Sequence, residues 1–249
     1  MYLRIVFIFI VICFFNQKIL PETIQKGFLN IKNQSMIDLK GEWEFYWQKF
    51  YTLQEIHQIQ FKTYCYVPHN WIPCNQEHSG TGFATYYLKI QIPDRWLNQE
   101  IGLYIPTIGT SYKIYINGEL KEEVGKVSNI KSKQIPLYGN RIILWKAEKT
   151  EQEILIHVSN FYHKSGGLWY NISFGLKKEI EHLFFKNLFF DLALFGSVFI
   201  MALFHFGIFI QKFLLRNTNQ YRRKYKFRTK HFIFFYFLLF DFYKNFICK

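Results

Sequence analysis

Apolar and polar residues alternate along much of the chain between residues 39 and 175, which is the pattern of β-strands with one buried face. The alternation is clearest at 86–92, 112–116 and 154–158. Asn117-Gly118 follows the second of these stretches and is a strong hairpin signal, because both central residues of a type I′ turn take positive φ. The pattern predicts an antiparallel all-β sandwich or barrel. The side chains expected to point into its core are Ile114, Ile116, Ile154, Ile156 and Val158.

An unbroken apolar run at 5–15 follows a short, positively charged start. As a helix this run would extend about 16 Å, roughly half of a bilayer's hydrocarbon core, which is too short to span a membrane. We therefore predict that residues 1–16 are a signal peptide or signal-like segment that directs export. No A-x-A pattern of small residues marks a cleavage site, so cleavage stays open.

Two further apolar runs, nearer the C-terminus, are candidate membrane segments. The run at 188–210 contains 23 residues. It would extend about 35 Å as a helix and is predicted to span a bilayer. The run at 232–240 is shorter and is followed by Asp241 and Lys244, so 232–248 are predicted as a partial second transmembrane helix. We expect that the chain ends partway through a larger membrane domain.

The formal net charge of +13 is concentrated in one short segment. Residues 212–230 carry eight lysines and arginines and no acid, whereas residues 16–187 carry twenty bases and sixteen acids. This small excess on the main body is too low for a surface that tracks phosphates, which excludes nucleic acid as a partner. By the positive-inside rule, 211–231 form a basic cytoplasmic loop and a domain at 35–180 lies across the membrane from it.

The composition requires a folded or membrane-bound protein. Half of the residues are apolar and 21% are aromatic, which excludes a disordered chain, a collagen and a simple coiled coil. A length of 249 residues allows one sizeable domain with attachments.

Residue patterns for catalysis and cofactor binding are scarce. Glu42 and Glu44 share one face of a predicted strand, but solvated strand-edge charges explain them better than a catalytic pair. The eight histidines form no H-x-x-x-H or H-x-H pattern, and the chain has no P-loop and no dinucleotide fingerprint. We therefore predict no enzyme activity, no cofactor and no metal site.

Cys65 and Cys74 form the one cysteine pair within the predicted exported domain. Export permits a disulfide, and nine residues across a proline-containing bend allow the two sulfurs to approach. Two buried thiols fit the sequence equally well, so both states stay open.

Five ordered motifs carry a family resemblance. They are LKGEWEF at 39–45, VPHNW at 67–71, GFATYY at 82–87, IYING at 114–118 and VSNF at 158–161. Together they resemble the galactose-binding-like jelly roll at the front of family 2 glycoside hydrolases. This resemblance implies a galactose-binding-like jelly-roll sandwich, and the apolar runs at 188–210 and 232–240 would follow it with one or more transmembrane helices.

A second resemblance is closer in detail. Tyr112 with Asn117-Gly118, GKV at 125–127 and SNFYHKSGGLW at 159–169 resemble the type 2 extracellular domain of bacterial seven-transmembrane receptors with diverse intracellular signalling modules. The chain departs from that family because it ends in the second helix and has no output domain. The resemblance therefore implies a receptor truncated in the membrane region, which would need a signalling partner protein.

These resemblances lead to one functional expectation and two alternatives. We expect the ligand-sensing domain of a membrane signalling receptor, outside the cytoplasmic (inner) membrane of a bacterium, with the lipid bilayer and a carbohydrate-like small ligand as partners. The first alternative is an accessory sugar-binding domain related to an exported glycoside hydrolase. The second is a non-functional fragment of a receptor gene.

The long polar loop at 159–169 is the predicted ligand site, because sugar sites combine aromatic faces with amide and charged groups on loops. His69 and Asn70 with Trp71 form a second polar-aromatic cluster. We expect Trp43, Trp47 and Trp71 to fill the core rather than bind a ligand. The predicted ligand-binding residues are Asn160, His163, Lys164 and Trp169.

Overall fold

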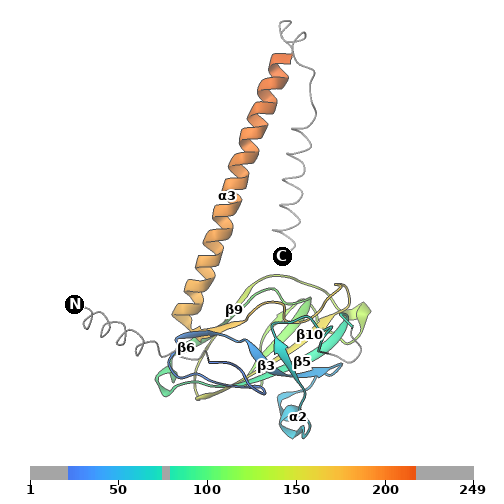
Figure 1. Ribbon diagram of the computed structural model, residues 1–249, viewed down its shortest axis with the longest axis vertical. Coiled ribbons are helices and arrows are strands. Elements are labelled where there is room, and N and C mark those ends of the chain that lie inside the picture. The colour runs from blue at the N-terminus through green and yellow to red at the C-terminus, as the bar shows by residue number, and fades with distance from the viewer. Residues whose placement is uncertain (1–21, 75–78, 217–249) are drawn as a thin grey trace, which may run out of the picture.

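The structure is a computed structural model that describes residues 22–74 and 79–216 (Figure 1). The predicted signal segment at 1–16 and the predicted partial helix at 232–248 lie outside the described residues, as does most of the predicted basic loop at 211–231. The described chain forms a two-sheet β-sandwich, and a long helix leaves it on one side (Figure 1).

The larger sheet has seven strands in the order β4-β3-β5-β10-β7-β8, with β1 pairing in parallel beside β5. The neighbours along the six-strand path are antiparallel. Its strands are β1 (Phe28–Asn30), β3 (Gly41–Trp47), β4 (Tyr64–Val67), β5 (Gly82–Gln91), β7 (Ser111–Ile116), β8 (Glu119–Val124) and β10 (Glu151–Asn160).

The smaller sheet has four antiparallel strands in the order β2-β11-β6-β9. They are β2 (Met36–Asp38), β6 (Glu100–Ile105), β9 (Arg141–Lys146) and β11 (Ser173–Leu176). The helices are α2 (Leu53–Gln58) and α3 (Lys177–Arg216), with short 3-10 turns η1 (Asp94–Trp96) and η2 (Lys131–Lys133). The predicted all-β sandwich followed by an apolar helix is confirmed.

The predicted core register is also confirmed. Ile154 pairs with Ile116 and Ile156 pairs with Ile114 across β10 and β7, and all four side chains are buried between the sheets. Val158 belongs to the same core. Asn117 and Gly118 have φ values of 52° and 88°, as the type I′ hairpin requires.

Tryptophans fill this core, as expected. Trp43 and Trp71 are fully buried, and Trp47 is partly buried and packs against the cluster. The sandwich also takes in residues upstream of the predicted boundary at residue 35, because Ile24 and Leu29 lie in the core and β1 extends the larger sheet.

The outer face of the larger sheet carries a second, smaller apolar cluster beneath α2. Thr52 caps this helix by accepting from the Glu55 N–H, and Glu55 reaches back to the Thr52 backbone. Ile56 is the buried residue of the helix and packs with Tyr46, Tyr87 and Leu155. The helix therefore covers part of a face that would otherwise be open to solvent, and it forms one side of the cleft described below.

Candidate functional site: a polar-aromatic cleft on the larger sheet

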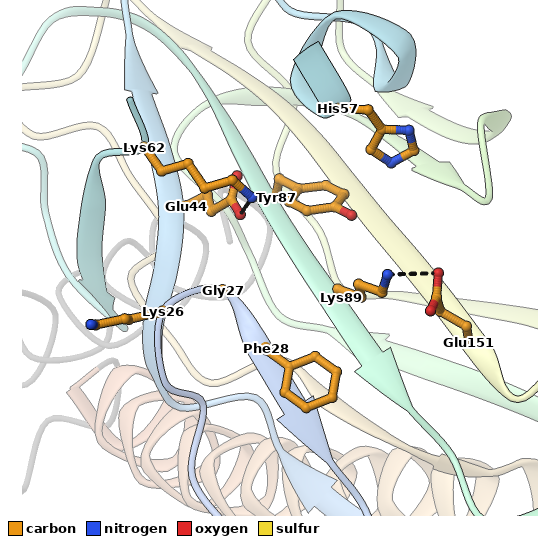
Figure 2. A pocket seen from close by; sticks show the side chains of 9 residues that line it. All are labelled: Lys26, Gly27, Phe28, Glu44, His57, Lys62, Tyr87, Lys89 and Glu151. Atoms are coloured by element: carbon orange, nitrogen blue, oxygen red, sulfur yellow. Dashed lines mark hydrogen bonds and ion pairs between the residues drawn. The ribbon is translucent and has the colours of Figure 1, made fainter. Parts of the chain in front are cut away.

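An open cleft of about 440 Å³ lies on the outer face of the larger sheet, near α2 (Figure 2). This volume is within the range of small-molecule sites in proteins. Its walls combine two aromatic rings with charged side chains of both signs. The lining residues are Lys26, Gly27, Phe28, Glu44, His57, Lys62, Tyr87, Lys89 and Glu151.

Strand pairing explains how these residues come together. Glu44 of β3 lies opposite Tyr87 of β5, and Phe28 of β1 lies opposite Lys89 of β5. Tyr87 and Lys89 are two residues apart, so they point to the same face of the sheet. On the other side of β5, Lys89 lies opposite Glu153 and forms an ion pair with Glu151 at 2.8 Å.

Glu44 is the most deeply buried acid of the cleft, with 2% of its side chain exposed. The Lys62 ammonium group lies 2.5 Å from one of its oxygens, and the Tyr46 hydroxyl donates to the other at 2.7 Å. Burial, and then this carboxylate, raise the pKa of Tyr46 far above its ordinary value. The expectation that Glu44 is a solvated strand-edge charge is therefore wrong.

The turn at Gly27 explains how Glu44 is covered. Gly27 has a φ of +72°, and a Cβ atom there would lie 2.7 Å from the Glu44 Cγ atom. A larger residue would meet both backbone strain and a steric clash. The absence of a side chain lets this turn close over the buried carboxylate.

Glu153 lies beside the cleft and holds two of its lining residues in place. The Tyr87 hydroxyl donates to its Oε1 atom at 2.5 Å, and His57 Nε2 lies 2.6 Å from the same oxygen. Burial alone would raise the pKa of Glu153, but the bonds from Tyr87 and His57 outweigh burial and lower the pKa. Burial and the same bond raise the pKa of Tyr87, which keeps its hydroxyl protonated as a donor.

The cleft offers binding groups rather than an activated nucleophile. Glu44 and Glu153 lie on β3 and β10, two strands that are separated by β5 and so lie about 10 Å apart, and both carboxylates already accept hydrogen bonds. Phe28 contributes an apolar ring that is 43% exposed, beside Lys89 and Glu151 (Figure 2). An exposed ring next to fixed donors and acceptors suits a ligand that has both an apolar face and hydroxyl groups.

The predicted loop at 159–169 divides into a buried residue and an exposed group. Asn160 is fully buried, and its amide nitrogen donates to the carbonyl oxygens of Gly80 and His163, both at 2.8 Å. Its amide oxygen accepts from Thr110 and from the His163 N–H. These four bonds use the full capacity of the amide, so Asn160 holds the loop in shape.

The other three predicted ligand residues lie at the surface of this loop. His163 and Lys164 are exposed, and Trp169 is partly buried with its ring 4.9 Å from the His163 ring. The Trp169 ring packs against Gly109, and its buried Nε1–H has no hydrogen-bond partner among the described residues. The structure thus brings His163 and Trp169 together, while Asn160 lies beneath them.

The predicted cysteine pair lies at a separate buried network. The Cα atoms of Cys65 and Cys74 are 5.8 Å apart, and their sulfur atoms are placed as a disulfide. Trp71 Nε1–H donates to the Tyr86 hydroxyl at 2.7 Å, and that hydroxyl lies 2.8 Å from His69 Nε2. His69 Nδ1 lies 2.7 Å from the Asn70 carbonyl oxygen, which can only accept.

This network assigns the proton of His69 and bears on metal binding. The Asn70 carbonyl requires a proton on Nδ1, so Nε2 accepts from Tyr86. Burial lowers the pKa of His69 to about 4, which keeps the ring neutral. Cys65, His69 and Cys74 present potential ligand atoms within 4.8 Å of one another, but a protonated Nδ1 offers no lone pair to a metal.

No local sequence pattern marks the cleft. Phe28, Glu44 and Glu151 are far apart in the chain, and only the pairing of β1, β3 and β10 with β5 places them on one face. The one local signal is the pair Glu42 and Glu44, whose position on a predicted strand favours solvated charge.

The solved structures to which this chain is similar are larger enzymes, and the match covers only part of each of them. A Ruminococcus gnavus β-glucuronidase is 14% identical, with a TM-score of 0.42, and the match covers 64% of this chain and 31% of that enzyme. A calcium-binding mutant of Bacteroides uniformis β-glucuronidase 2 is 17% identical, with a TM-score of 0.44 and coverages of 56% and 17%.

A GH2 β-galacturonidase from Eisenbergiella tayi, bound to galacturonate, is 11% identical, with a TM-score of 0.41 and coverages of 57% and 24%. This chain thus spans less than a third of the length of each of these enzymes. No family model and no curated protein matches the sequence.

Proposed function

We propose that this chain is a membrane-anchored binding domain, in which the sandwich takes a carbohydrate-like small ligand in the cleft on the larger sheet and does not cleave it. The observation that carries the proposal is the cleft itself, where the exposed Phe28 ring lies beside the paired charges of Lys89 and Glu151. A sugar presents an apolar face to such a ring and hydroxyl groups to such charges.

The anchor is α3. This helix has 40 residues and would be about 60 Å long. Its most apolar 18-residue window has a mean hydropathy of 2.2, and only 6% of that window is buried against the rest of the chain. An apolar helix in a soluble protein buries at least one face, so a bilayer is the environment that suits this exposed surface.

The cleft favours binding without turnover. Its buried acid, Glu44, is neutralised by Lys62, and Glu153 is held by Tyr87 and His57. Neither carboxylate is placed as a free acid or base beside an open position. Weak binding, in the micromolar to millimolar range, is expected for a shallow site that competes with water.

We propose a sensory role as the finer assignment, in which the domain is the extracytoplasmic part of a membrane signalling receptor and a partner protein supplies the output. The motifs at 112–118 and 159–169 support it by resemblance. An accessory sugar-binding domain of an exported glycosidase is the second candidate, favoured by the motifs at 39–45 and 67–71. The adjacent coding sequence separates the two, since five further apolar segments with a signalling module support a receptor, and a barrel with paired acids supports a glycosidase.

The test of binding uses the full chain in lipid nanodiscs and a panel of mono- and disaccharides, monitored by saturation-transfer NMR and calorimetry. Phe28→Ala and Lys89→Gln should weaken binding at least tenfold. The matched control is Phe61→Ala, because Phe61 is 89% exposed and does not line the cleft. Trp169→Ala and Lys164→Ala test the loop at 159–169 as the second candidate site. Binding that survives both cleft variants and is lost in the loop variants would move the site to the loop.

A further inference from the structure

Two loops of the sandwich have an unusual surface composition. Residues 125–140 connect β8 to β9, and residues 161–172 connect β10 to β11. Together these loops contain four lysines and no aspartate or glutamate. They also expose large apolar side chains to solvent. The exposed apolar residues are Ile130, Ile135, Leu137, Tyr162 and Tyr170.

The two loops are held together as one platform. The Gln134 side chain is buried and donates to the Ser159 carbonyl at 2.7 Å, while its amide oxygen accepts from the Phe161 N–H at 2.8 Å. The Tyr162 hydroxyl donates to the Lys131 carbonyl at 3.1 Å. Because these bonds link the first loop to the second, their exposed side chains form one fixed surface, which we call the basic-apolar platform.

Contacts between α3 and the smaller sheet show where the apolar surface of the helix begins. The Phe184 ring packs 6.4 Å from the Tyr104 ring, and the Asn187 side chain donates to the Tyr104 hydroxyl at 3.4 Å. Asn187 is the last polar residue before the apolar run at 188–210. The helix therefore becomes apolar at the level of Tyr104.

Tyr104 also marks the point at which both loops join the smaller sheet. Its neighbours across the strands are Ile142 of β9 and Ser173 of β11. These residues lie within two positions of the ends of the loops at 125–140 and 161–172. Figure 1 shows α3 leaving the sandwich on the side of β6 and β9, away from α2.

We propose that the basic-apolar platform contacts the surface of the bilayer that α3 enters, so that the sandwich rests on anionic lipid. This inference depends on the proposed membrane anchor. Tyrosines and aliphatic side chains suit the headgroup region, where their apolar parts meet the acyl chains. Lysines attract anionic headgroups, and their aliphatic stems lie along apolar surface. The loops thus present the residue types that a lipid surface binds, at the level where the helix enters it.

The test places a benzoylphenylalanine photocrosslinker at single positions of the full chain in nanodiscs of phosphatidylcholine and phosphatidylglycerol. Leu137 probes the platform. Leu120 is the matched control, because both leucines are 47% exposed and Leu120 lies on β8 next to the hairpin at Asn117-Gly118. Phe199 probes the anchor, since it is an exposed residue in the middle of α3.

Lipid adducts, measured by mass spectrometry, are expected at Leu137 and at Phe199, with at least tenfold less adduct at Leu120. Adducts at Phe199 with equal, low yields at Leu137 and Leu120 would overturn the platform contact and leave the anchor standing. No adduct at Phe199 would overturn both. Replacing all four loop lysines with glutamine should lower the Leu137 yield several-fold and leave the Phe199 yield unchanged. An unchanged Leu137 yield would overturn the role of charge.

Discussion

Glu153 shows how burial and hydrogen bonding compete at a single carboxyl group. Burial alone favours its protonated form, whereas the bonds from Tyr87 and His57 favour the carboxylate and lower its pKa. A carboxyl group with a lowered pKa stabilises the fold at pH values above the unfolded value of 4.5, and this stabilisation is lost as the pH falls through the folded pKa. The two residues that hold Glu153 therefore also set part of the acid stability.

Removing one of these donors gives the first prediction. Tyr87→Phe should raise the pKa of Glu153 and lower the free energy of unfolding at pH 7 by about 1 kcal/mol. The difference from the wild type should shrink as the pH falls below 4.5. Carbon-detected NMR titration of the Glu153 carboxyl measures the pKa, and denaturant unfolding measures the stability. An unchanged pKa would contradict the hydrogen bond from Tyr87.

His69 should add to the acid sensitivity in the same direction as Glu153, because burial lowers the pKa of this base to about 4. Between that value and the ordinary 6.5, the unfolded chain binds a proton that the folded chain does not, so stability falls as the pH drops through this window. The loss should reach up to about 3 kcal/mol. Unfolding measured from pH 7 to pH 4 should show this slope in the wild type and a weaker one in His69→Gln. Equal slopes would mean that His69 titrates normally in the fold.

At the scale of the element, the alternation of apolar and polar residues predicts the burial of one face of β10 but not of the other. Ile154 and Ile156 point into the main core, as their spacing predicts, because period-two alternation is a local property of strands. Leu155 points to the other face, and it is also buried, beneath Ile56 of α2. The sequence shows no sign that a short helix 100 residues earlier covers this face. The cleft beside α2 was unpredictable for the same reason.

The two faces of β10 give a prediction at this scale. Ile156→Asp should prevent folding of the sandwich, because an unpaired buried charge costs several kcal/mol. Leu155→Asp should destabilise less, because its cluster lies near the surface under one short helix and can open locally. Circular dichroism melts compare the two variants. A larger loss in Leu155→Asp would contradict the assignment of Ile156 to the main core.

The disulfide between Cys65 of β4 and Cys74 in the following bend gives a further prediction at the scale of the element. The Cα atoms of Cys65 and Cys74 are 5.8 Å apart, and we expect the two thiols to be oxidised to a disulfide in an exported domain. Cys65→Ser should then cost about 2–4 kcal/mol of stability. Maleimide labelling of the unfolded chain without reductant should leave Cys65 and Cys74 unmodified, and reductant should add two further labels. Labels on Cys65 and Cys74 without reductant would show free thiols.

At the scale of the whole molecule, the apolar helix α3 follows the sandwich in the chain, as the sequence predicts. The apolar run at 188–210 was predicted from length and composition alone, and it lies within the single helix α3. The proposed position of the loops at 125–140 and 161–172 near the start of the apolar run depends on the pairing of β6 with β9 and β11, which no local pattern encodes. The orientation that we propose rests on charge, since the positive-inside rule favours the cytoplasmic side for the bases at 212–230.

Enzyme fusions to the full-length sequence test that orientation. Alkaline phosphatase becomes active only where its disulfides form, outside the cytoplasm. Fused after Leu183, ahead of the apolar run, it should be active in cells, and fused after Lys230, beyond the basic segment, it should be inactive. Replacing Arg222, Arg223 and Lys224 with glutamine should raise the activity of the second fusion, because the positive-inside bias is weaker. The reverse pattern, with activity after Lys230 and none after Leu183, would place the sandwich and its cleft in the cytoplasm and remove an extracytoplasmic ligand from the proposed function.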